Sequence, residues 1–125
     1  MSLDDFLKSE FDWETDAYGV NITDYYGKGV NVVVPQIIDG KPVTSIGRWA
    51  FCGCSGLVSI TIPDGVTRIG ECVFLNCKGL ISITIPSGVM GIWGKTFSGC
   101  SGLERITIPN SVEWIGERSF SVAAV

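Results

Sequence analysis

The 125-residue chain contains no histidine and few charged side chains: nine Lys and Arg and thirteen Asp and Glu make up 18% of it. Without histidine, the chain lacks the commonest general base and the commonest side-chain ligand of transition metals. It also lacks a basic stripe, since the formal net charge is −4, and nucleic acid is therefore not the expected partner. These absences favour a protein that is not an enzyme and that uses no metal or cofactor.

Long apolar runs and targeting segments are missing too. No run approaches the roughly 20 apolar residues that a membrane-spanning helix needs, so membrane insertion is not expected. The N-terminus lacks the basic and then apolar layout of a signal peptide, so the chain is either cytoplasmic or a piece of a longer secreted protein. Because 46% of the residues are hydrophobic, disorder is not expected either.

A 23-residue repeat fills most of the chain. Residues 57–79, 80–102 and 103–125 align without gaps, and the first two copies are identical at 12 of 23 positions. Unrelated segments would agree at roughly one or two. A divergent first coil, residues 22–56, shows the same pattern with a longer loop. We therefore predict a solenoid of about four coils over residues 20–125, because a single coil cannot bury its own apolar face.

Each coil is predicted to contain two short extended segments. The first reads Ser-Ile-Thr-Ile or Arg-Ile-Thr-Ile, an alternation typical of a half-buried strand with both Ile side chains inward. A proline ends this strand in every full copy, because proline donates no ladder hydrogen bond. A Val and an Ile then form the second segment. One phenylalanine per coil is expected to fill the turn back: Phe51, Phe74, Phe97 and Phe120.

Residues 1–19 hold most of the acidic excess, and we expect them to form an acidic leader or cap. Ser2 is a good N-cap for a short helix there, in which Leu3, Phe6 and Leu7 share one face. A cap is needed because an open solenoid end exposes core. The apolar residues that follow predict a β-hairpin or an irregular cap over the first coil: Phe11, Trp13, Tyr18, Ile22 and Tyr26.

The repeat L-x-x-I-T-I-P-x-x-V-x-x-I-G-x-x-x-F-x-x-C-x-G resembles the BspA-type (Treponema pallidum-type) leucine-rich repeat over roughly residues 20–122. The resemblance implies a β-rich leucine-rich-repeat solenoid, a right-handed superhelix with a parallel sheet on one face. Members are mostly surface-anchored or secreted proteins associated with adhesion and partner binding, and no catalytic motif is attached to the repeat. The resemblance thus implies a non-catalytic module, on the cell surface or secreted, that binds a protein or a glycan.

Two surfaces are candidates for partner binding. One is the outward face of the first strands, which presents Ser59, Thr61, Ser82, Thr84, Arg105 and Thr107. The other is Trp93 with Trp114, each aligned with a glycine in an adjacent coil as though its indole lay over that glycine. Both have a purely structural alternative. A threonine ladder suits any exposed strand, and indoles pack within a protein as readily as against a partner.

Five cysteines raise the question of a metal or redox site. Cys54, Cys77 and Cys100 share one repeat position, and we expect a column of buried thiols packed near neighbouring backbone. Metal ligands converge on one point, whereas these residues are strung along an axis without histidine. Cys72 aligns with long side chains in the other coils, so we expect it to be the most exposed thiol.

The chain ends on apolar residues, Val122 to Val125, without a recognisable cap. Either the native protein continues, or this end pairs with something. An alternative function is therefore a structural, self-assembling unit that stacks through its uncapped C-terminal coil.

Overall fold

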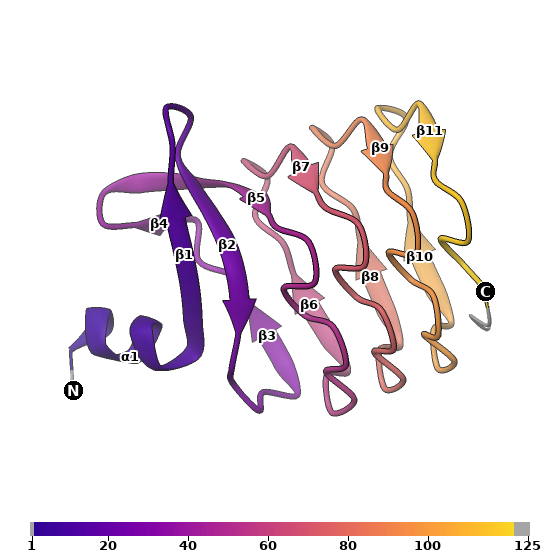
Figure 1. The fold of residues 1–125 in the computed structure, drawn as a ribbon, viewed down its shortest axis with the longest axis horizontal. Coiled ribbons are helices and arrows are strands. Elements are labelled where there is room, and N and C mark those ends of the chain that lie inside the picture. Colours follow the sequence, from indigo (N-terminus) through magenta and orange to yellow (C-terminus); the bar gives the residue numbers. More distant parts are fainter. Residues whose placement is uncertain (1, 122–125) are drawn as a thin grey trace.

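A computed structural model describes residues 2–121 and shows a row of stacked coils with a helix and a hairpin at one end (Figure 1). The helix α1 spans Leu3–Glu10. Its N-cap is Ser2, as predicted: the Ser2 hydroxyl accepts the Asp5 N–H at 3.1 Å, and the Asp5 carboxylate accepts the Ser2 N–H at 3.4 Å. The predicted apolar face is only partly right. Leu7 is buried, but Leu3 and Phe6 are exposed, because only the C-terminal end of the helix reaches the core.

The predicted hairpin is confirmed. Strands β1 (Phe11–Thr15) and β2 (Val20–Tyr25) pair antiparallel, and β2 continues in parallel with β5 (Lys41–Ile46). The hairpin therefore extends one sheet of the solenoid. The longer loop of the first coil forms β4 (Ile37–Ile38), which pairs antiparallel with β5.

Two rows of parallel strands run along the coils. The first strand of each coil forms a four-stranded sheet in the order β10-β8-β6-β3, where its members are β3 (Asn31–Val33), β6 (Ser59–Thr61), β8 (Ser82–Thr84) and β10 (Arg105–Thr107). The second row follows β5 and holds β7 (Arg68–Ile69), β9 (Gly91–Ile92) and β11 (Trp114–Ile115). Both predicted segments of the coil are thus present, and a parallel-strand solenoid of about four turns with 23-residue spacing is confirmed.

The centre of the solenoid is a column of stacked aromatic rings. Phe51, Phe74, Phe97 and Phe120 follow one another with ring centroids 5.5–5.7 Å apart and interplanar angles of 10–26°. Tyr25 of the hairpin stacks on Phe51 at 5.0 Å and so continues the column into the cap. The hairpin closes the core because its own ring occupies the position that a further coil would fill.

The thiols beside this column are structural. The Cys77 thiol donates a hydrogen bond to the Phe51 carbonyl at 3.0 Å, and the Cys100 thiol donates to the Phe74 carbonyl at 3.1 Å. Cys54, in the first coil, is half-buried. The predicted column of buried thiols against neighbouring backbone is therefore observed for Cys77 and Cys100 but not for Cys54, and all five cysteines are free thiols.

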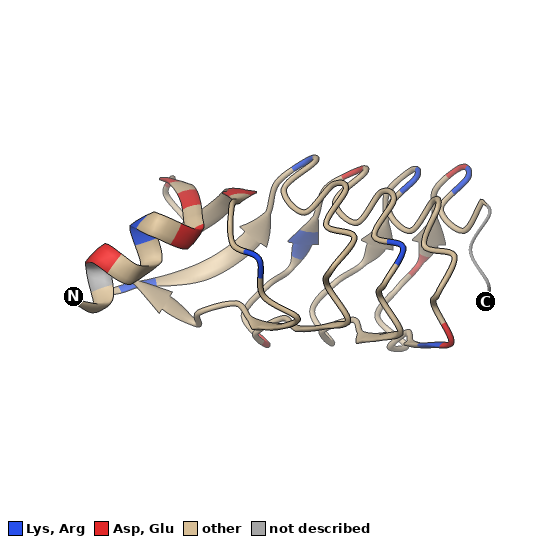
Figure 2. Cartoon of the chain, turned by 90° about the horizontal axis from the view of Figure 1, so that it is seen from below, with Lys and Arg blue, Asp and Glu red and all other residues tan. Residues whose placement is uncertain are grey.

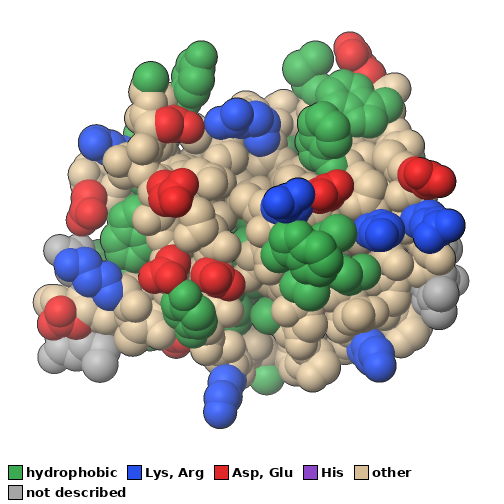
Figure 3. Space-filling model, viewed as in Figure 1, with side chains coloured by type: hydrophobic (Ala, Val, Ile, Leu, Met, Phe, Trp, Pro, Cys, Tyr) green, Lys and Arg blue, Asp and Glu red, His purple; other side chains and the backbone are tan. Residues whose placement is uncertain are grey.

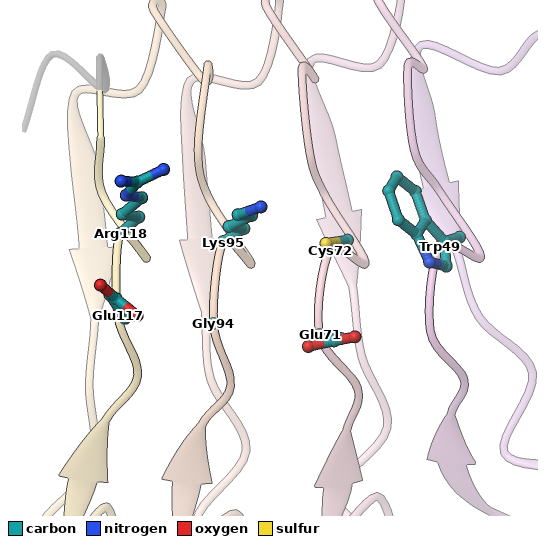
Figure 4. Close-up of a pocket in the computed structure, with 7 residues that line it drawn as sticks. All are labelled: Trp49, Glu71, Cys72, Gly94, Lys95, Glu117 and Arg118. Carbon is teal, nitrogen blue, oxygen red and sulfur yellow. The ribbon is translucent and has the colours of Figure 1, made fainter.

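The prediction that Cys72 is the most exposed thiol is wrong. Cys72 is only 3% exposed, whereas Cys52 and Cys54 are half-buried. Cys72 has a left-handed backbone with φ of 59°, as have Trp49 and Lys95 at the same position of the adjacent coils. Its coil lies between the coils of Trp49 and Lys95 (Figure 4), and its short side chain stays below the surface that these long side chains reach.

Candidate binding site

The outward face of the first sheet carries mainly uncharged polar side chains. Thr61, Thr84, Thr107 and Arg105 are exposed there, while Ser59 and Ser82 are half-buried; these are the six residues predicted for this face. The Ser59 hydroxyl donates to Asn31 Oδ1 at 2.7 Å. Between β6 and β8 lies a hollow of about 380 Å³, also lined by Asp64 and Pro86. Figure 2 shows acidic residues concentrated on α1 and the segment beside it, with others scattered along the coils.

The two predicted tryptophans meet on the other row of strands. Trp93 and Trp114 form an edge-to-face pair with ring centroids 5.8 Å apart and an interplanar angle of 81°. Trp114 lies over Gly91, as predicted, because a methyl group on Gly91 would overlap the indole. Trp93 differs: around Gly70, the atoms nearest to such a methyl group are backbone atoms of Arg48 and its neighbour. Figure 3 shows hydrophobic side chains gathered over β9 and β11 on this side of the molecule.

A hollow of about 310 Å³ opens beside Trp93. We call it the aromatic groove. Trp93 occupies a repeat position that holds glycine in the two preceding coils, Gly47 and Gly70, so those coils present no side chain at this position. The hairpin and the strands β5 and β7 supply the remaining walls: Asp16, Asn21, Ser45, Ile46 and Arg68.

The polar groups of the aromatic groove are of both signs. Asp16 and Arg68 face each other at 3.6 Å, and both side chains are half exposed. Asp16 Oδ1 accepts the N–H groups of Tyr18 and Gly19 at 2.8 and 3.0 Å. These two bonds, and to a smaller extent Arg68, hold the pKa of Asp16 below its ordinary value of 3.8. The carboxylate is therefore ionised at neutral pH.

Asn21 is held in place by a buried partner. The hydroxyl of Ser45, which is 5% exposed, donates to Asn21 Oδ1 at 2.8 Å. Within residues 2–121, Asn21 Nδ2 makes no hydrogen bond, so its two N–H donors remain available. The groove thus offers a carboxylate, a guanidinium and an oriented carboxamide next to an indole face.

A second hollow, of about 460 Å³, adjoins the aromatic groove at Arg68, which lines both. Its other lining residues are Tyr18, Thr44, Gly65 and Thr67. Tyr18, at the tip of the hairpin, is 77% exposed.

A further hollow of about 410 Å³ lies over the segments that follow the second row of strands (Figure 4). Trp49 and Cys72 line it together with the charged residues Glu71, Lys95, Glu117 and Arg118. Glu71 pairs with Arg48, outside the hollow, at 3.1 Å. Burial and the carboxylate of Glu71 raise the pKa of the Cys72 thiol, so this thiol is not activated as a nucleophile. Only the Cys54 thiol has a lowered pKa, through the neighbouring Cys77 thiol rather than through a base or a cation.

Sequence reasoning found the indoles but missed the polar half of the groove. Asp16 and Asn21 lie in the hairpin, which has no counterpart in the repeats and therefore no column in the alignment. Arg68 was detectable, because it shares a column with Gly91 and Trp114. Among residues 2–121, no group of three His, Cys, Asp or Glu side chains is placed to hold a metal ion. No helix in that range is both long and apolar enough to span a bilayer.

The comparison with known families identifies the repeat. A family model described as the BspA type leucine rich repeat region (6 copies) matches residues 30–124. The chain belongs to this family. A search of curated proteins finds no match.

Solved structures of leucine-rich repeat proteins match this member of the BspA-type family along most of its length. The T. pallidum protein is 37% identical with a TM-score of 0.83, and the match covers 86% of this chain and 51% of that one. The Bacteroides ovatus protein is 34% identical with a TM-score of 0.84, covering 91% and 32%. A leucine rich cell surface protein from Faecalibacterium prausnitzii is 26% identical with a TM-score of 0.57, covering 93% and 45%. This chain thus spans about half, or less, of these relatives.

Proposed function

We propose that this BspA-type repeat protein is a non-catalytic binding module that holds a protein or glycan ligand on the Trp93 and Trp114 side of the solenoid. The observation behind this proposal is the edge-to-face indole pair itself. The two side chains are 50% and 43% exposed, although burying them would be favourable. Exposed tryptophans beside a hollow are typical of binding hot spots.

The absence of activated groups among residues 2–121 supports a non-catalytic role. The whole sequence lacks histidine, and burial raises the pKa of the Cys72 and Cys100 thiols, that of Cys100 to about 11. Two of the carboxylates that line hollows, Asp16 and Glu71, are each paired with an arginine. In the described part of the chain, Tyr26 is the only residue whose hydroxyl or thiol donates a hydrogen bond to a carboxylate, that of Asp12, and this bond raises the pKa of Tyr26 instead of activating it.

The experiment is affinity capture with matched variants. The chain is immobilised through its N-terminus and exposed to host extracellular-matrix extract and to culture medium, with mass spectrometry as the readout. We expect saturable binding of one dominant component, weakened about tenfold or more by Trp93→Ala and by Trp114→Ala. Arg105→Ala, on the opposite sheet, is the matched control. Loss of binding with Arg105→Ala alone would move the site to the Ser and Thr face, and the absence of any saturable ligand would contradict the binding role.

A location on the cell surface or outside the cell fits this function. It is supported by the resemblance to a family of mostly surface or secreted proteins and by the F. prausnitzii relative, which is a cell surface protein. Labelling of intact producing cells with a membrane-impermeant amine reagent is the test. Labelling only after cell lysis would favour the cytoplasmic alternative.

A second candidate function is self-association through the last coil, and the exposed outer edge of that coil supports it. Strands β10 and β11 have no partner on their outer edge within residues 2–121, and Ile108 and Ile115 are 37% and 51% exposed there. Val122 to Val125, on which this prediction first rested, lie outside the described residues. Such an edge is a template for adding strands. Light scattering that shows only monomer at high protein concentration would exclude self-stacking.

A further inference from the structure

We infer that the aromatic groove is a carbohydrate-binding site in which a neutral sugar ring stacks on the exposed face of Trp93 and the hydroxyls of the sugar bond to Asn21, Asp16 and Arg68. This inference rests on the proposed binding function, because it names the class of ligand for the same side of the molecule. It also adds three polar residues that lie outside the indole pair.

The indole of Trp93 is presented as a fixed platform. The two indoles meet at about a right angle with ring centroids 5.8 Å apart, and Trp114 is itself seated over Gly91. Half of the Trp93 side chain remains open to solvent. A ring held in advance loses little conformational entropy when a ligand binds, which favours affinity for a small, flat partner. The C–H groups on one face of a pyranose form such a partner, because they are apolar and meet the electron-rich face of an indole.

The floor of the groove leaves room for a ring. At the repeat position of Trp93, the two preceding coils have Gly47 and Gly70 and so present only backbone. The resulting volume of about 310 Å³ lies within the range of small-ligand sites, roughly 300–1,000 Å³. At Gly70 a methyl group would come within 2.7 Å of the Arg48 backbone nitrogen, so packing of adjacent coils keeps this position bare. The hollow is thus a consequence of the fold at the one coil where tryptophan replaces glycine.

The polar groups fit hydroxyls, which both donate and accept hydrogen bonds. The amide of Asn21 has its oxygen engaged by Ser45 and its N–H groups available. Asp16 offers a carboxylate as an acceptor, and Arg68, held only at 3.6 Å and 61% exposed in its side chain, offers donors. The two charges cancel, so the groove shows no excess of either sign. This favours a neutral sugar over an acidic polysaccharide or an acidic peptide.

The adjoining hollow favours an oligosaccharide over a single sugar. Arg68 lines both hollows, and the exposed ring of Tyr18 stands at the second one. A chain of sugar units lying across Arg68 would place one ring on Trp93 and a later unit near Tyr18. A monosaccharide is therefore expected to bind more weakly than a longer chain of the same sugar.

The test uses native gels that contain one neutral polysaccharide each: soluble starch, β-1,3-glucan, mannan or galactan. We expect at least one of them to retard the protein and to change its tryptophan fluorescence. Trp93→Ala should lower the affinity tenfold or more, Arg68→Ala several-fold, and Trp93→Tyr less than Trp93→Ala. Trp49→Ala is the matched control, because Trp49 is 49% exposed and lies outside the groove. Equal urea midpoints for the wild type and these variants exclude a loss of folding.

The inference is overturned if none of the four polysaccharides retards the wild-type chain, or if Trp49→Ala weakens binding as much as Trp93→Ala. A second capture experiment, with matrix glycoproteins whose glycans have been removed by enzymes, distinguishes failure of this inference from failure of the proposed function. Trp93-dependent capture of a stripped protein would leave the binding module intact and make its ligand a polypeptide. Loss of both kinds of binding would remove the proposed function as well.

Discussion

The stacked phenylalanine column makes a sharp prediction for Phe74→Ala. Phe74 is fully buried and lies between Phe51 at 5.7 Å and Phe97 at 5.6 Å. Removing its ring loses the stabilisation from burying the side chain, about 1.5–3 kcal/mol, and two aromatic contacts of about 0.5–1.5 kcal/mol each. Measured Phe→Ala changes in cores cost about 3–5 kcal/mol. We therefore expect the free energy of unfolding to fall by about 4 kcal/mol.

The assay is equilibrium unfolding in urea, followed by tryptophan fluorescence. Because a loss of about 4 kcal/mol approaches the whole stability of many domains, roughly 5–15 kcal/mol, Phe74→Leu serves as a milder variant with an expected loss of about 1.5 kcal/mol or less. Phe6→Ala is the matched control, since Phe6 is 47% exposed on α1 and should cost about 0.5 kcal/mol or less. A loss for Phe74→Ala below about 2 kcal/mol, or no larger than that for Phe6→Ala, would refute the view that this column holds the coils together.

Three further predictions concern hydrogen bonds and titration. Cys77→Ala should destabilise the fold by about 0.5–1.5 kcal/mol in urea unfolding, because the Phe51 carbonyl loses one of its two donors and keeps only the Cys54 N–H at 3.3 Å, whereas Cys77→Ser should lose less. Ultraviolet titration should show Tyr26 ionising with a pKa of about 12, which is raised mainly by its hydrogen bond to Asp12. Asp12→Asn should bring this pKa back toward 10. The stability that the Tyr26–Asp12 hydrogen bond contributes should be lost only as the pH rises through the folded pKa of Tyr26. The pKa of Asp16 is lowered instead, so the stability difference between wild type and Asp16→Asn should be full above pH 3.8 and vanish as the pH falls through the lower folded value. An unchanged difference at low pH would contradict that assignment.

The repeating part of the fold could be predicted because a strict period shows which residues share a column. The strands with inward Ile60 and Ile83, the phenylalanine column and the Cys77 and Cys100 thiols all follow from equivalent positions in equivalent coils. The boundary at residue 20 between leader and repeats stays a prediction, since β2 begins there but belongs to the hairpin.

What could not be predicted depends on contacts without a period. The exposure of Cys72 was misjudged because the alignment gives the column of a residue but not how deeply a short side chain sits below its long neighbours in that column, Trp49 and Lys95. The polar wall of the aromatic groove was missed because Asp16 and Asn21 come from the hairpin, and no spacing relates a unique segment to Trp93 in a later coil. The positions of the Ser and Thr face were found, but whether they bind a partner stays a prediction.

The walls of the aromatic groove come from different coils, so the number of coils between them sets the width of the groove. One wall comes from the hairpin beside β5, the other from Trp93 after β9, and β7 lies between them. Each coil between these walls contributes one strand, and neighbouring strands lie about 4.8 Å apart. Duplicating or deleting one 23-residue unit in the genetic sequence would therefore widen or narrow the gap by a single fixed step and leave each coil's own packing unchanged. The width of this groove is thus set by the number of coils between its walls and can change only in whole strand spacings.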